Sequence, residues 1–157
     1  MDTVMSEEKL QDVFDEVTRE VTEKVAGIRL CEGDVSPEED ACTVHAAFER
    51  GFHSSLALCA DTAMFTRLTQ SMLQEEEVTR QDVEDFTKEY FNVLCGHIAS
   101  RLFQVTKVAS RFEIPAFYNG RYQPENQKEQ FAICYSSDKN EGARLSHFTS
   151  DSDSELL

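Results

Sequence analysis

The sequence predicts an α+β fold in which long helices pack on a mostly antiparallel sheet. Three stretches carry apolar residues at helical spacing, and shorter apolar runs between and after them are bounded by turn residues. Neighbouring runs are joined by connections of a few residues, which favours antiparallel pairing. A helix followed by strands occurs twice, so the pattern also indicates a weak internal pseudo-two-fold repetition.

The first half of the chain is expected to contain a helix over residues 6–26, a strand over 28–32, a hairpin with strands 43–48 and 52–59, and a helix over 62–73. Ser6 is a candidate N-cap of the first helix, and Gly27 is placed to end it. Gly51 suits the left-handed backbone of a three-residue hairpin turn. Asp61 directly precedes the second helix and is predicted to cap it.

The second half is expected to contain a helix from residue 83 to about 106, an extended segment over 108–118, and strands over 131–135 and 143–148. Thr79 and Asp82 have the spacing of a capping box before this helix. Pro115 interrupts the extended segment, which is typical of an edge strand or a bulge. Residues 1–149 are predicted to form one domain and residues 150–157 a disordered acidic tail.

Composition and charge exclude several classes of function. Thirty acidic residues against fifteen basic ones give a net charge of −15, which argues against binding to nucleic acid or to an anionic membrane. No apolar run is long enough to span a bilayer and no signal-peptide pattern is present, so a cytoplasmic location is expected. The five cysteines are widely spaced without a C-x-x-C pair, so reduced thiols are expected and no metal site is predicted.

The third predicted helix has two contrasting faces. Its apolar stripe, which is predicted to be buried, consists of Val83, Phe91, Leu94, Ile98, Leu102 and Val105. Glu89, Asn92 and Gly96 fall on the opposite side at positions i, i+3 and i+7. A mid-helix glycine costs about 1 kcal/mol relative to alanine, but on an exposed face it allows another molecule to approach the backbone. The simplest alternative is a solvated helix face, which Glu and Asn commonly occupy.

This motif, on a helix that follows a hairpin and a short helix, resembles the signature of the CheC/CheX chemotaxis phosphatases and is most similar to CheX. In that family the helix usually reads Gly-Glu-x-x-Asn-x-x-x-Gly, and Glu89, Asn92 and Gly96 match the pattern. Two flanking positions differ: Lys88 replaces a small residue, and His97 stands where CheX often has Asn. The resemblance covers roughly residues 5–149 and implies the fold of that family.

The resemblance also implies an activity, which is hydrolysis of the aspartyl phosphate on a CheY-like receiver domain. Asn92 would orient the attacking water, because a carboxamide donates and accepts hydrogen bonds without titrating. Glu89 would pair with the receiver's lysine. The receiver would supply its own Mg²⁺, so no cofactor bound by this chain is expected. On the first helix the equivalent spacing gives Glu16-x-x-Arg19, which lacks the amide, so a single site is implied, as in CheX.

Further residues are candidates for contact with the receiver. Gly96 and Lys88 flank the pair, and Val93 and Phe103 lie toward the exposed side of the same helix, unless the second helix covers them. A different class of function also fits the sequence: a non-catalytic module of the same fold that docks on a receiver or on a flagellar-switch component. Because CheX-like proteins are commonly dimers, the resemblance also implies a possible homodimer.

Overall fold

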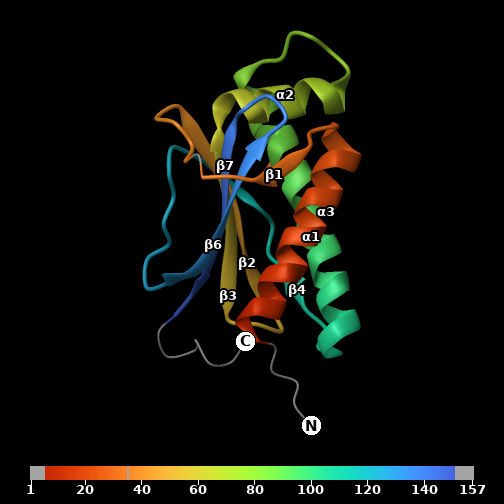
Figure 1. The fold of residues 1–157 in the computed structure, drawn as a ribbon, viewed down its shortest axis with the longest axis vertical. Coiled ribbons are helices and arrows are strands. Elements are labelled where there is room, and N and C mark those ends of the chain that lie inside the picture. Colours follow the sequence, from red (N-terminus) through yellow and green to blue (C-terminus); the bar gives the residue numbers. More distant parts are fainter. Residues whose placement is uncertain (1–5, 35, 151–157) are drawn as a thin grey trace.

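The chain folds into one sheet with helices packed on one face, so the predicted α+β class is confirmed (Figure 1). The computed structural model describes residues 6–34 and 36–150. In chain order the elements are α1 Glu7–Ala26, β1 Leu30–Glu32, β2 Ala41–Arg50, β3 Ser54–Asp61, α2 Thr62–Leu73, α3 Arg80–Thr106, β4 Arg111–Phe112, β5 Ala116–Asn119, β6 Lys128–Ser137 and β7 Gly142–Thr149. In Figure 1, α1 and α3 run side by side along the sheet, and α2 crosses one end of them.

The sheet has an internal symmetry that matches the predicted repetition. Its strand order is β1-β6-β7-β3-β2, and β4 and β5 both pair with the outer side of β2. All pairs are antiparallel. The order reads the same from both edges: β7 and β3 form the centre, β6 and β2 flank them, and β1 and β5 lie outermost. Each half of the chain therefore supplies an outer strand to the hairpin of the other half.

The core lies between the inner face of the sheet and the pair of helices α1 and α3. α1 contributes buried apolar residues at helical spacing, which are Leu10, Val13, Phe14, Val17, Val21 and Ala26. Strands of both halves contribute side chains from every second position, among them Val44, Leu56, Leu58, Phe131, Tyr135 and Leu145. Burial of this apolar surface is the main driving force for the helices to pack on the sheet.

The buried face of α3 differs from the predicted stripe at five positions. Four residues are buried although they were not assigned to the core: Thr87, Tyr90, Cys95 and Thr106. Val105 was assigned to it, but 45% of its surface is exposed, so this prediction was wrong. Helical periodicity assumes that a partner covers the whole length of the stripe. α3 has 27 residues and α1 only 20, so the last turn of α3 is covered less.

The ends of both long helices are set by the predicted local signals. Ser6 Oγ accepts a hydrogen bond from the Lys9 backbone N–H at 3.2 Å, and Gly27 ends α1 at φ +67°. Thr79 and Asp82 form the reciprocal capping box of α3, with distances of 3.0 and 2.9 Å. The register of α3, and with it the direction of its outward face, is therefore fixed from its first turn.

Asp61 has a different role from the predicted one. It occupies the N-cap position of α2, but its side chain makes no capping hydrogen bond. Its carboxylate instead accepts the backbone N–H of Glu38 at 2.6 Å and that of Gly142 at 2.8 Å. The capping prediction was wrong because backbone donors from the loop before β2 and from β7 occupy this carboxylate.

Pro115 interrupts the edge of the sheet beside α3, as predicted. The proline lies between β4 and β5, and both of these short strands pair with β2. This arrangement places residues 108–112 next to the C-terminal half of α3. Most of the predicted acidic tail, residues 151–157, lies outside the described residues.

Candidate functional site

The candidate site is the outward face of α3, and its direction is fixed by the residues that α3 buries. Tyr90 and Phe91 lie between Glu89 and Asn92 in the sequence and have no exposed surface. The Tyr90 hydroxyl also forms a hydrogen bond with Thr22 Oγ1 of α1 at 2.5 Å. Because helix positions are coupled by the 3.6-residue repeat, burying Tyr90 and Phe91 turns Glu89 and Asn92 toward solvent.

Glu89 and Asn92 are both exposed and unengaged. Within the part of the chain that the structure describes, neither side chain forms a hydrogen bond or an ion pair. An exposed carboxylate and an exposed carboxamide, one helical turn apart, are therefore available to another molecule. This is the arrangement that the sequence predicted for these two residues.

Gly96 lies one turn further along the same face and has no internal reason to be glycine. A Cβ built at this position would meet no atom within 4 Å, and the residue does not have a positive φ. Alanine would therefore fit the folded chain and favour the helix by about 1 kcal/mol. The absence of a side chain here lowers the helix face beside Asn92, which suits close approach of a partner.

The other predicted partner contacts differ in their surroundings. The Lys88 ammonium pairs with Glu84 of the same helix at 3.5 Å, and 35% of the Lys88 side chain is exposed. Val93 is half-buried and packs against the core, whereas 47% of the Phe103 surface is exposed. His97 is exposed. Phe103 is thus the clearest apolar contact of this face, and Val93 mainly supports the core.

A groove of about 540 Å³ runs along this face, between the C-terminal half of α3 and the segment that contains β4. The α3 wall begins at Asn92 and continues to Phe103, and the opposite wall is formed by residues 109–112. This second wall was not predicted from the sequence, because it depends on the pairing of β4 with β2 rather than on local spacing. Asn92 therefore stands at the end of a groove rather than on an isolated helix.

The chemistry of the site is that of a positioning surface. Cys95 also lines the groove, but burial raises the pKa of its thiol well above the usual range, so it stays protonated and is a poor nucleophile. Among the described residues, no group of three or more His, Cys, Asp or Glu side chains is arranged to hold a metal ion. Asn92 and Glu89 can orient a water molecule and pair with a cation on another protein.

Comparison with known proteins places the chain in a family. A family model described as chemotaxis phosphatase CheX matches residues 42–136, which is more than half of the sequence and includes Glu89 and Asn92. No curated protein matches the chain at a significant level. None of the helices in the described ranges is long and apolar enough to cross a bilayer.

Several solved structures share the fold at low sequence identity. A chemotaxis protein CheX from Desulfovibrio desulfuricans aligns with a TM-score of 0.73 at 17% identity, over 88% of this chain and 97% of that chain. The CheX–CheY–BeF3–Mg²⁺ complex from Borrelia burgdorferi gives 0.69 at 14% identity, over 89% and 96%. FliY from Thermotoga maritima gives 0.63 at 13% identity, over 96% and 93%. The likeness covers nearly the whole of each structure.

Proposed function

The chain belongs to the CheX family of chemotaxis phosphatases, and from this premise we propose that it accelerates hydrolysis of the aspartyl phosphate of a CheY-like receiver domain. The observation that carries the proposal is the free pair on α3. Glu89 and Asn92 are exposed and have no partner within residues 6–34 and 36–150, and Gly96 leaves the adjacent surface open. A pair held by the fold for structural reasons would have partners within the chain.

In the proposed reaction, Asn92 enters the receiver's site and holds one water molecule in line with the phosphorus–oxygen bond. The water oxygen attacks phosphorus, the bond to the aspartyl oxygen breaks, and the products are inorganic phosphate and the free aspartate. Such transfers depend on in-line positioning and charge stabilisation more than on covalent help from the protein. A carboxamide suits this task because it binds water in one protonation state at all relevant pH values.

Glu89 supplies the docking contact in this proposal. Its carboxylate lies one turn from Asn92 and is free to accept a charge-assisted hydrogen bond from the receiver's lysine. That contact would fix the depth and rotation of α3 in the receiver's site. Mg²⁺ would come with the receiver. The Borrelia burgdorferi complex of a CheX with CheY, BeF3 and Mg²⁺ supports this class of partner.

The decisive experiment compares the decay of a phosphorylated receiver from the same genome with and without this protein, in Mg²⁺. The proposal predicts faster decay, and Glu89→Ala should raise the receiver concentration needed for half-maximal rate by about tenfold. Binding is measured in parallel with the same receiver activated by BeF3⁻. Measurable binding with unchanged decay would reject the phosphatase and favour the alternative of a non-catalytic docking module of the same fold.

A further inference from the structure

One segment of this acidic chain contains no acid. From residue 90 to residue 112 there is no Asp or Glu, although the whole chain has 30. The same segment carries Arg101, Lys107 and Arg111. This segment consists of the part of α3 that follows Glu89, the turn after α3, and β4. All residues that line the groove beside Asn92 come from this segment, so the groove wall contains no carboxylate.

The three basic side chains of this segment differ in their ion-pair partners. Arg101 reaches Glu16 and Glu20 of α1, each at 3.3 Å, on the side of α3 away from the groove. Arg111 lines the groove and pairs with Glu49 at 2.8 Å, but both side chains are about half exposed, so this pair is weak. Lys107 caps α3 and forms no ion pair in the described structure.

Lys107 lies beside Phe103, which is one of the residues that line the groove. The Lys107 ammonium lies 5.9 Å from the centre of the Phe103 ring, so a positive charge stands over an exposed apolar surface. Phe112 adds a second aromatic side chain on the opposite wall. The lining also includes the small residues Gly96, Ala99 and Ser100. The groove thus has an aromatic side chain on each wall, Arg111 among its lining residues, Lys107 beside Phe103, and no acidic residue in its lining.

We infer that this groove is the second docking point for the receiver and that it takes a surface segment in which an apolar side chain stands beside a carboxylate. The inference rests on the receiver-docking part of the proposed function. Its basis is charge complementarity and continuity, because the groove starts at Asn92 and a local positive region opposes the repulsion expected between an acidic partner and a chain of net charge −15. Apolar contact with Phe103 would then hold the partner in register.

The test is a pair of charge reversals that change the net charge equally. Lys107→Glu reverses the charge beside Phe103 of the groove, and Lys24→Glu reverses a charge in the last turn of α1, where the exposed Lys24 lies away from the groove lining. Phe103→Ser removes the apolar contact without a change in charge. Each variant is assayed for affinity to the BeF3⁻-activated receiver and for KM and kcat on the phosphorylated receiver, at low and at moderate salt. Thermal melts confirm that the variants are folded.

The inference predicts that Lys107→Glu weakens binding about tenfold at low salt and raises KM, with less effect on kcat, and that this loss shrinks as salt screens the charges. Phe103→Ser should also weaken binding, at both salt concentrations, and Lys24→Glu should stay near the wild-type affinity. Equal effects of the two charge reversals, or wild-type affinity of Lys107→Glu and Phe103→Ser, would overturn it. If the protein speeds receiver dephosphorylation but Lys107→Glu and Phe103→Ser bind the receiver like the wild type, only this inference is rejected. If these substitutions weaken binding but the wild-type protein does not speed dephosphorylation, only the catalytic proposal is rejected.

Discussion

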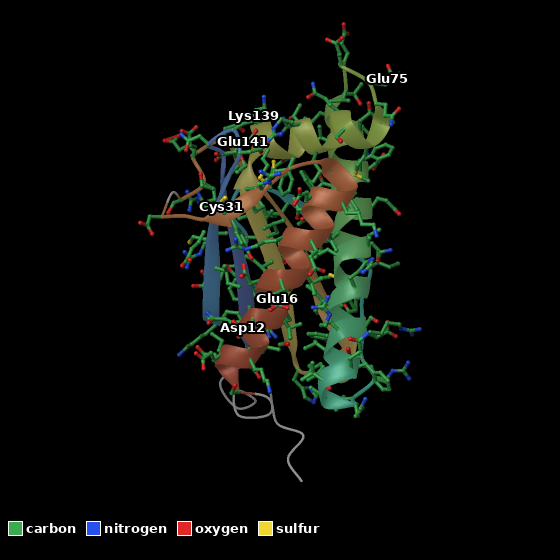
Figure 2. The ribbon with its side chains drawn as sticks, turned by 45° about the vertical axis from the view of Figure 1, so that its right-hand side comes forward. Asp12, Glu16, Cys31, Glu75, Lys139 and Glu141 are labelled. Carbon is green, nitrogen blue, oxygen red and sulfur yellow. The ribbon has the colours of Figure 1, made fainter. Side chains whose placement is uncertain are left out.

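α1 and α3 occupy related places in the two halves of the fold, but they use their outward faces differently. On α1 the residues that correspond to the Glu89–Asn92 pair are Glu16 and Arg19. Arg19 donates to Asp15 at 2.9 Å and lies over the Tyr135 ring, and Glu16 accepts from Arg101 of α3. Figure 2 shows Glu16 on α1 with α3 running beside it. On α3 the equivalent polar side chains have no partner among the described residues.

This contrast extends to the surroundings of each pair. Asp15 also accepts the Tyr135 hydroxyl at 2.8 Å, which ties α1 to β6. The hydrogen bond that Arg19 donates to Asp15 raises the pKa of Arg19, and burial together with the nearby Asp15 carboxylate raises the pKa of Tyr135 above its usual range. Seven residues after Glu16 stands Glu23, where α3 has Gly96 seven residues after Glu89. Polar spacing on a helix therefore indicates a site only when the fold itself leaves the side chains unused.

The most direct test of this difference between the helices is to replace the corresponding residue on each, Asn92 on α3 and Arg19 on α1, with alanine. Asn92→Ala should lower kcat for receiver dephosphorylation by on the order of a hundredfold, with binding largely kept, because it removes only water positioning. Arg19→Ala should keep kcat within about twofold and lower the free energy of unfolding by about 1 kcal/mol, since it removes a partly exposed ion pair. Single-turnover decay and denaturant melts measure the two quantities. Wild-type rates after Asn92→Ala would reject the role of that residue.

A second test concerns a buried histidine that packs against α1, the helix whose polar face is used within the fold. His147 packs against Phe14 of α1, with ring centres 5.3 Å apart, and burial lowers its pKa to about 3. The unfolded chain binds a proton near pH 6.5 that the folded chain excludes, so stability should fall as pH drops from about 6.5 toward 3, by about 1.4 kcal/mol per unit.

His147→Phe removes this titrating group while it keeps an aromatic ring beside Phe14. Between pH 6 and pH 4 the unfolding free energy of this variant should fall less steeply with decreasing pH than that of the wild type. The two slopes should differ by about 1.4 kcal/mol per pH unit. Chemical denaturation at several pH values measures the slope. Identical slopes for the two proteins would show that this histidine is not the source of acid sensitivity.

The smallest change sharpens the comparison on the α3 side. Gly96→Ala should raise the free energy of unfolding by about 1 kcal/mol, because a Cβ at this position meets no atom and alanine favours the helix. The same methyl group should raise KM for the receiver on the order of tenfold, since it lifts the partner from the helix face. Glu23→Ala on α1 is the matched control and should leave KM unchanged. A Gly96→Ala variant that is more stable and fully active would remove the close-approach argument.

The local part of this structure was predictable from the sequence. Caps at Ser6 and at Thr79 with Asp82, the boundaries of α2 and the outward direction of Glu89 depend on contacts three or four residues apart. Such contacts repeat with the helical period, so a single sequence contains them. The family resemblance added a function to this face, and the family match over residues 42–136 confirmed the resemblance.

Contacts between distant segments were decided only by the tertiary structure. The use of Asp61 by backbone donors of Glu38 and Gly142, the exposure of Val105, and the second wall of the groove all depend on which segments meet. Strand pairing brings together residues far apart in the chain, and local spacing does not specify such partners. The amino-acid sequence thus determined that Glu89 and Asn92 face outward, and the fold determined that they have no partner among the described residues and lie beside a groove lined by no acidic residue.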